Sequence, residues 1–462
     1  MTPSSRLVRA SRAALAFVTH RTGRTIFVAG LGLVVLYLAA MIVLRKPNGR
    51  VVFGDATHTF VQLRSIVFDR DLDFQNEYMR IYGLDAQVPG TEWIFTDRTS
   101  TGYVRNYMPI GPALLWAPLY ILAAGVQLML SWMGLAARPD GFDRVLQLMP
   151  GITGIAAATC AAWLSWRIVR TRTSIGVSAA AVFGVWFGSH ALYYSLASPS
   201  YSHTASMLAS SALLAVWLEQ RGRVTKARLA GWGALAGLAA LMRWQDALFI
   251  AIPLIEALRW RAPFAERVAG AAAVVLAFFV AFSPQMIVWS VLYGQPLALP
   301  QGASFMRWTA PHPFLVLFSD NHGLFTWAPI LFPAVIGVVA LLRRDRNLAL
   351  PIAVVIFASW YTNAAVADWW AGEAFGARRF LSLFPLFVLG LGIWLQPEVS
   401  APVRPWRMAV VLGLCLMNGL LLLQYELVMK GLDQIAPVPS GWYDMWLVRF
   451  AVPIRVVRGW LW

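Results

Sequence analysis

The sequence predicts an all-α polytopic membrane protein, and three observations support this fold class. Of the 462 residues, 59% are hydrophobic and 13% are charged, which is about half the charged share of a soluble globular chain. Several apolar runs approach or exceed the ~20 residues that a helix needs to cross a bilayer. The 22 Trp and 26 Phe suit wide membrane–water interfaces, where aromatic rings gather. These properties exclude a soluble multidomain protein.

The chain is predicted to begin with a cytoplasmic tail, residues 1–25, whose arginines precede the first apolar run. That run is longer than the apolar core of a signal peptide, so we expect it to be retained. About eleven transmembrane helices follow within residues 26–426, at 26–45, 145–166, 175–193, 204–219, 229–243, 246–258, 268–293, 325–342, 348–366, 380–395 and 408–426. The last segment, 427–462, alternates Trp with Arg and is predicted to be a periplasmic interfacial tail.

The apolar stretch 108–134, inside a long outer loop at 46–144, decides the orientation of all later spans. If it lies along the outer surface, more than half of the 38 Lys and Arg fall in the N-terminal tail and the inner loops. If it crosses, five basic loops move outside, against the tendency of basic residues to stay in short cytoplasmic loops. Its prolines and glycines suit an irregular or re-entrant segment. We therefore expect an interfacial helix at 108–134 and a long first periplasmic loop with juxtamembrane helices.

The net charge of +16 fits this topology better than it fits nucleic-acid binding, because the arginines form short clusters between apolar stretches. Such clusters attract anionic headgroups, so membrane lipids are the expected partners and nucleic acid is not. The two cysteines lie inside apolar runs, which predicts no disulfide framework. The chain is expected in a bacterial-type inner membrane, with a cytoplasmic N-terminus and a periplasmic active site.

Titratable side chains gather on the predicted outer face, which marks it as the working side of the protein. The alternative is that large loops outside the membrane are simply polar; the same enrichment in the shorter loops favours the functional reading. Asp55 follows the first span closely and should lie near the bilayer surface. Low dielectric there raises the pKa of a carboxyl group and allows it to take a proton, and His58 would share its helix face. The alternative is that Asp55 caps a helix over 56–68. The sequence leaves both roles open.

Two further outer turns combine arginines with acids. Arg243 and Asp246 separate two apolar stretches, and a guanidinium there suits a phosphate group, while an intrahelical pair of these two residues is the alternative. The segment 368–380 packs acids, aromatic residues and glycines between two spans and is poorly explained as a plain connection. It contributes the candidate substrate-binding residues Glu373, Arg378 and Arg379.

Three other motifs leave their roles open. His322, in Asp320-Asn321-His322-Gly323, is a candidate hydrogen-bond donor to a phosphate, a candidate metal ligand, or an ordinary loop residue. His203 opens a span from the outer side, as a ligand or as a helix cap. The acidic run 68–74 looks like a metal site, although acids alternating with an arginine are typical of a solvated turn. The metal requirement is therefore unknown: a divalent cation is compatible with the expected chemistry and is not required by it.

In order and arrangement, these features resemble the GT-C membrane glycosyltransferases, especially the protein O-mannosyltransferase and aminoarabinose-transferase-like branch, glycosyltransferase family 39. The similarity in arrangement runs over most of the chain. It is carried by Gly54-Asp55, by Tyr107-Met108-Pro109-Ile110-Gly111-Pro112, by the turn that ends in Arg243, and by Arg378-Arg379-Phe380 ahead of Pro385. Two features depart from the family pattern. Arg243 is followed by Trp-Gln instead of Gly-Pro, and Asp55 lacks the adjacent acid of the mannosyltransferases.

The resemblance implies a GT-C-like bundle and a hexosyl- or pentosyltransferase that uses a polyprenyl-phosphate-linked sugar. It implies transfer with inversion to a lipid, polysaccharide or protein acceptor on the periplasmic face. Asp55 would be the catalytic base, and the donor phosphate would be held by cationic side chains. The substrate-binding residues would be His58, Arg243, His322, Glu373, Arg378 and Arg379.

A second class of function is a membrane transporter or lipid-linked-sugar flippase without covalent chemistry. Transporters place ionisable groups near the bilayer midplane and often consist of two related halves. In this sequence acids are nearly absent from the predicted spans, and no matching halves are found. A third reading is an inactive scaffold of the same fold. The glycosyltransferase is the favoured prediction.

Overall fold

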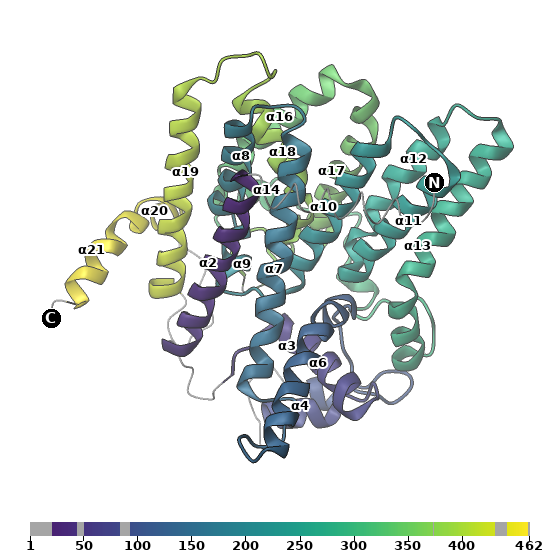
Figure 1. Ribbon diagram of the computed structural model, residues 1–462, viewed down its shortest axis with the longest axis vertical. Coiled ribbons are helices and arrows are strands. Elements are labelled where there is room, and N and C mark those ends of the chain that lie inside the picture. The colour runs from purple at the N-terminus through teal and green to yellow at the C-terminus, as the bar shows by residue number, and fades with distance from the viewer. Residues whose placement is uncertain (1–20, 44–49, 84–92, 373, 430–440, 461–462) are drawn as a thin grey trace.

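The computed structural model describes residues 21–43, 50–83, 93–372, 374–429 and 441–460. Within these ranges the chain is helical, and its only β-type pairings are two isolated bridges, one between Arg98 and Val104 and one between Met306 and Val366. The long helices stand side by side as a bundle (Figure 1). The predicted all-α class is therefore confirmed.

The elements follow one another along the described chain. The helices are α2 Arg21–Val43, α3 Asp55–Arg64, α4 Gln75–Tyr82, α5 Trp93–Thr96, α6 Gly111–Trp132, α7 Arg144–Val169, α8 Ile175–Gly188, α9 Ala191–Leu196, α10 Ser202–Gln220, α11 Lys226–Met242, α12 Ala251–Arg259, α13 Phe264–Tyr293, α14 Leu315–Phe318, α15 Leu324–Trp327, α16 Leu331–Arg344, α17 Arg346–Ala365, α18 Phe384–Leu395, α19 Pro405–Gln424, α20 Trp442–Trp446 and α21 Val448–Trp460. Short 3₁₀ turns lie at η2 Trp244–Ile250, η3 Ala303–Phe305 and η4 Arg378–Leu383, and π turns at η1 Ser65–Asp69 and η5 Tyr425–Met429.

Seven helices of the described chain are long and apolar enough to cross a membrane. They are Arg21–Ile42, Gly111–Trp132, Arg144–Val169, Phe264–Tyr293, Arg346–Ala365, Arg378–Leu395 and Pro405–Leu427. All but Gly111–Trp132 coincide with predicted spans. The other predicted spans fall on α8, α10, α11, η2 with α12, and α15 with α16, which are shorter or less apolar. The count of eleven spans stays a prediction.

Close packing between the helices depends on small residues. Gly337 of α16 lies against the backbone of Gly390 in α18, and an added Cβ at either glycine would overlap a backbone carbonyl oxygen of the other helix. Gly233 of α11 lies in the same way against the Val274 carbonyl in α13. Because lipid tails provide no hydrophobic drive for association, such van der Waals contact holds membrane helices together. It fixes α11, which ends just before Arg243, and α18, which follows the turn η4 that begins at Arg378.

The first outer loop packs at one end of the bundle, where α3, α4 and α6 lie together (Figure 1). The segment before α6 is tied to both sides of this end: Gln62 donates to the Met108 carbonyl across 2.9 Å, and Gln285 of α13 accepts from the Ile110 N–H across 2.8 Å. The helix α6 then runs unbroken from Gly111 to Trp132.

The expectation of an irregular segment is therefore wrong for residues 111–132, which form a helix as the interfacial reading predicted. A re-entrant course stays a prediction. Pro112 lies in the first turn of α6, where its missing N–H has no intrahelical partner to lose. Pro118 lies inside the helix and removes one hydrogen bond, which the rest of this long helix tolerates. The interfacial placement of α6 stays a prediction.

The C-terminal helices α20 and α21 extend outward beside α19 (Figure 1). Phe450, Ile454 and Val457 are exposed on α21, at the spacing that lines one face of a helix. This pattern agrees with an amphipathic tail, and its location at a membrane interface stays a prediction.

Candidate functional site

Asp55 lies in the first turn of α3, at the end of the bundle where the outer loop packs. The residue before it, Gly54, is the N-cap with a φ of 54°, and the Asp55 side chain makes no capping hydrogen bond. Instead, Asp55 Oδ2 accepts from the Arg378 guanidinium across 2.7 Å. The capping alternative that the sequence left open is therefore wrong: the carboxylate points to a distant part of the chain.

The surroundings of Asp55 favour its ionised form. Burial raises the pKa of the carboxyl group, but the positive charge of Arg378, with smaller contributions from His58, Arg243 and Arg379, brings the pKa below its usual value. The expected rise of the Asp55 pKa is therefore wrong, because an adjacent guanidinium outweighs the low dielectric. These groups lie close enough to act on one another, so the structure brings the predicted acid and arginines together.

Tyr201 supports the Asp55–Arg378 pair from the side of α10. The Arg378 guanidinium carbon lies 5.5 Å from the centre of the Tyr201 ring, and the Tyr201 hydroxyl accepts the backbone N–H of Asp55. A Cβ added at Gly54 would overlap this hydroxyl. Residue 54 therefore needs glycine for two reasons, the positive φ and the close approach of Tyr201.

Arg379 makes a different ion pair from its neighbour. Its Nη2 donates to both carboxylate oxygens of Asp368 at 2.9 Å, and its Nη1 donates to the Asp368 carbonyl at 2.7 Å, so Asp368 holds the guanidinium through side chain and backbone together. The connection between the two residues is tightly folded, with positive φ at Ala371, Gly372 and Gly376. Glu373, which the sequence also nominated, lies outside the described residues.

Arg243 is held by neutral groups. Its guanidinium donates to Nδ1 of His203 and, across 3.0 Å, to Oε1 of Gln245. Gln245 in turn donates to the Arg379 carbonyl across 3.1 Å, which links the turn after α11 to the turn before α18. Because both acceptors are uncharged, the positive charge of Arg243 is not neutralised by its hydrogen-bond partners. A lone anion would find this guanidinium available.

The alternative of an intrahelical Arg243–Asp246 ion pair is not found among the described residues. Asp246 is buried and accepts a hydrogen bond from Ser206 of α10 instead. Arg243 precedes the 3₁₀ turn η2 and has an extended backbone, with φ −153° and ψ 118°, so the two residues do not share a helix face. Asp246 anchors the turn to α10.

His58 lies one turn after Asp55 on α3, as the spacing predicts, and its Nδ1 is 2.7 Å from the Tyr78 hydroxyl of α4. Burial lowers the pKa of His58 to about 4, against the raising effect of Asp55. The imidazole is therefore neutral near pH 7. It can orient a hydroxyl group beside Asp55 without adding a positive charge.

His322 lies near the cluster but packs mainly against aromatic residues. Its ring centre is 4.6 Å from that of Trp327, and its backbone takes a φ of 62°. Burial, followed by the charge of Arg378, lowers the pKa of His322 to about 4. Its Nδ1 has no hydrogen-bond partner within the part of the chain that the structure describes. His322 is thus placed to donate or accept one hydrogen bond, and it supplies no charge near pH 7.

Sequence reasoning missed two of the residues that shape the site. Tyr201 carries no motif of its own, and Gln245 was noted only as a departure from the family pattern. Two others were foreseen only in part. His203, expected as a ligand or a helix cap, accepts from Arg243, and Asp368, which stood in the segment 368–380 without a role, fixes Arg379. Their positions in the sequence could have indicated them, because they lie near an arginine predicted to bind substrate or near the start of a predicted span.

The acidic run at 68–74 forms a turn whose carboxylates accept hydrogen bonds from nearby residues. Asp69 accepts from Asn76 across 2.7 Å, Asp71 accepts from the Ser65 hydroxyl across 2.7 Å, and Asp73 accepts from the Gln75 N–H across 3.2 Å. Arg70 takes a left-handed φ of 63° at the centre. Across the described ranges, no three His, Cys, Asp or Glu side chains gather as a metal site would require.

Taken together, the site places the ionised Asp55 carboxylate among three guanidinium groups at the end of an apolar bundle. Two arginines are paired with acids, Arg378 with Asp55 and Arg379 with Asp368, while Arg243 is paired with neutral groups. Such a cluster can bind an anionic group through its cations while the carboxylate accepts a proton from a neighbouring hydroxyl.

Comparison with known proteins gives a distant structural likeness. No protein-family model and no curated protein matches the sequence. Among solved structures, the chain is similar to the apo oligosaccharyltransferase of Archaeoglobus fulgidus, with a TM-score of 0.44 and 11% identity over 94% of this chain and 64% of that one. It is also similar to the same organism's oligosaccharyltransferase AglB in complex with an inhibitory peptide and a dolichol-phosphate, with a TM-score of 0.41 and 13% identity over 92% and 63%. The chain spans less than two thirds of the length of these structures.

Proposed function

We propose that the protein is a GT-C-type membrane glycosyltransferase that transfers a sugar from a polyprenyl-phosphate donor to a lipid, polysaccharide or protein acceptor, with inversion at the anomeric carbon. The observation that carries the proposal is the 2.7 Å pair of Asp55 and Arg378, with Arg243 and Arg379 acting on the same carboxylate. This set offers a proton acceptor and several phosphate ligands in one place. The branch of the superfamily, the sugar and the acceptor are left open.

On the acceptor side, Asp55 is the proposed base. The acceptor hydroxyl oxygen attacks the anomeric carbon, its proton passes to Asp55, and the bond between that carbon and the phosphate oxygen breaks. One in-line displacement inverts the anomeric centre. His58, one turn along α3 and hydrogen bonded to Tyr78, is placed to orient the acceptor hydroxyl.

On the donor side, the arginines stabilise the departing polyprenyl phosphate. Arg243 is the proposed first contact, since its hydrogen-bond partners are neutral. Arg378 is the second, and it can exchange its carboxylate partner for the phosphate. When Arg378 turns toward the phosphate, the pKa of Asp55 rises, because the largest charge that lowers it has moved away. Donor binding thereby makes Asp55 a stronger base.

The competing proposal of a transporter or flippase leaves the Asp55–Arg378 pair without a chemical task. A reconstituted system separates the proposals: proteoliposomes receive a radiolabelled polyprenyl-phosphate sugar, and the label is followed on acceptors and across the bilayer. Label on an acceptor supports the transferase. Label that crosses the membrane unaltered supports the transporter. If the label is neither transferred nor moved across the bilayer, the result supports an inactive scaffold.

The decisive variant in this assay is Asp55→Asn. We expect it to lower transfer by about 10²–10⁴-fold, the usual loss when a general base is removed, with expression unchanged. The matched control is Asp97→Asn, which alters a carboxylate of the same loop that pairs with Arg105 across 2.8 Å. Near-normal turnover by Asp55→Asn would remove Asp55 from the catalytic role.

A further inference from the structure

A charged cavity lies at the opposite end of the bundle from Asp55. Gln147, near the start of α7, accepts from the Val51 N–H across 3.0 Å, so this end of α7 is close to the start of α3. The other end of α7, ~39 Å away for a helix of 26 residues, leads into Arg172. The cavity of about 690 Å³ opens beside it and is lined by Arg172, Leu341, Arg344, Asp345, Arg346, Asn347, Ile393, Pro397, Glu398 and Val399.

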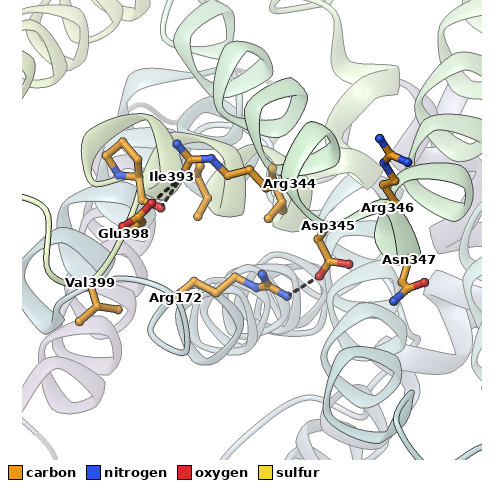
Figure 2. A pocket seen from close by; sticks show the side chains of 10 residues that line it. Arg172, Arg344, Asp345, Arg346, Asn347, Ile393, Glu398 and Val399 are labelled. Atoms are coloured by element: carbon orange, nitrogen blue, oxygen red, sulfur yellow. Dashed lines mark hydrogen bonds and ion pairs between the residues drawn. The ribbon is translucent and has the colours of Figure 1, made fainter.

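The charges in this cavity do not balance. Asp345 accepts from Arg221 across 2.8 Å and from Arg172 across 3.5 Å, so one carboxylate serves two guanidinium groups. Figure 2 shows Arg172 pointing at Asp345 on one side and Arg344 pointing at Glu398 on the other. The second pair is loose, at 3.9 Å, and both of its side chains are exposed. The arginines therefore exceed the acids, and the cavity keeps a positive charge.

The start of α17 adds to this positive character. The helix begins at Arg346, with Asp345 as its N-cap, and Arg346 and Asn347 both line the cavity. The Asp345 carboxylate already caps this helix end, since its side chain accepts from the Leu348 N–H across 3.3 Å. Arg346 makes no ion pair with a described acid and is exposed. The start of α17 thus adds a guanidinium group that can bind an anion.

The same cavity has an apolar wall and lies beside an aromatic cluster. Leu341 and Ile393 line it and are buried. The next residue of α18, Trp394, belongs to a cluster in which the Arg407 guanidinium carbon lies 5.2 Å from the Trp394 ring centre and 5.3 Å from that of Trp406. Trp406 is exposed. Tryptophan and arginine together are typical of the headgroup level of a bilayer.

We propose that this cavity binds the headgroup of an anionic phospholipid, with the phosphate at its arginines, Arg344 and Arg346 among them, and the glycerol end against Leu341 and Ile393. Its volume is within the range of small-molecule sites. The proposal does not depend on the proposed transferase activity, because it concerns the other end of the molecule. It assigns lipid binding to one defined cavity, whereas the general attraction of basic loops to the membrane predicts no particular site.

The test uses the purified full-length protein in a non-ionic detergent and native mass spectrometry. Wild type and the variant Arg344→Gln/Arg346→Gln are titrated with phosphatidylglycerol, with phosphatidylcholine, and with inorganic phosphate. The matched control, Arg223→Gln/Arg261→Gln, removes two exposed arginines from neighbouring predicted inner loops that do not line the cavity. Thermal unfolding of all three proteins checks that they are folded.

We expect wild type and the control to prefer phosphatidylglycerol over phosphatidylcholine, and the cavity variant to bind phosphatidylglycerol about tenfold more weakly. An equal loss in the control would overturn the proposal, because it would show a diffuse charge effect. So would the absence of a headgroup preference in wild type. The proposal would also be contradicted if inorganic phosphate bound through Arg344 and Arg346 and phosphatidylglycerol did not. In that case the ligand of the cavity would be a soluble anion.

Discussion

Asp55 and Arg378, which are far apart in the sequence, form a 2.7 Å ion pair against the ring of Tyr201. Because the carboxylate is at the start of α3 and the guanidinium is at the start of η4, the pair joins the outer loop to the helix bundle. It also sets the acidity of the proposed base, since Arg378 is the strongest of the charges that lower the Asp55 pKa.

This pairing predicts the pH dependence of transfer. Asp55 accepts a proton only when ionised, and its lowered pKa places the acid limb of the rate below the usual range for an aspartate. Replacing Arg378 by Gln leaves burial to dominate, so the pKa of Asp55 rises and the acid limb moves to higher pH. The measurement is kcat/KM against pH for both proteins. Arg379→Gln is the comparison, with a smaller shift expected, because Arg379 contributes less to the Asp55 pKa. Identical acid limbs in wild type and Arg378→Gln would contradict the assignment.

His203 is expected to position Arg243. In His203→Ala the guanidinium loses an acceptor, and a hydrogen bond to a charged group contributes about 1.5–3 kcal/mol, so KM for the polyprenyl-phosphate sugar should rise by about tenfold or more. His203→Asn keeps an acceptor near the position of Nδ1 and should recover much of the loss. Steady-state kinetics separate KM from kcat. If Ala and Asn behave alike, the imidazole has a packing role instead.

Gly54 should be intolerant of a side chain, in a way that depends on Tyr201. Gly54→Ala places a Cβ on the Tyr201 hydroxyl and holds a non-glycine residue at a φ of 54°, so we expect it to displace the start of α3 and lower transfer. The double variant Gly54→Ala/Tyr201→Phe removes the overlapping hydroxyl and should recover part of the activity. The remaining loss reports the backbone strain, ~1–3 kcal/mol for a residue held in a sparsely populated region. The check is a double-mutant comparison of initial rates, with Tyr201→Phe alone as the reference; no recovery would mean that strain accounts for the whole effect.

Glu77 of α4 should make the outer loop sensitive to pH. Its side chain is fully buried and accepts from Arg64 across 3.0 Å, yet burial raises the pKa of Glu77 from 4.5 to about 7. A raised folded-state pKa means that stability is greatest below the unfolded value and declines as pH rises from 4.5 through 7. The decline amounts to about 3 kcal/mol in total.

Glu77→Gln should remove this dependence. Thermal unfolding between pH 4.5 and pH 7.5 should show a falling melting temperature for wild type and a flatter profile for the variant. Asp140→Asn, which alters a half-exposed partner of Arg80 in the same loop, serves as the control and should follow wild type. Parallel curves for wild type and Glu77→Gln would show that Glu77 is ionised throughout.

Much of the fold could be predicted from the sequence because each transmembrane helix carries its own signal, a run of apolar residues long enough to cross a bilayer. The spans that became α2, α7, α13, α17, α18 and α19 were identified in this way. The local signal was weaker where glycine and proline interrupt an apolar run. For that reason the segment that forms α6 was expected to be irregular. The local pattern could not show that Gln62 and Gln285 form hydrogen bonds with the backbone just before this helix.

The sequence by itself determined which kinds of residue stand on which loops: an aspartate after the first span and arginines at two later turns. Only the tertiary structure decided which of them meet. It pairs Asp55 with Arg378 in preference to a helix cap, Arg243 with His203 in preference to Asp246, and Arg379 with Asp368. The physical reason is that hydrogen bonds and ion pairs act over only a few ångströms. The packing of apolar helices brings residues that are far apart in the sequence within that distance. The charged side chains themselves contribute little to this packing.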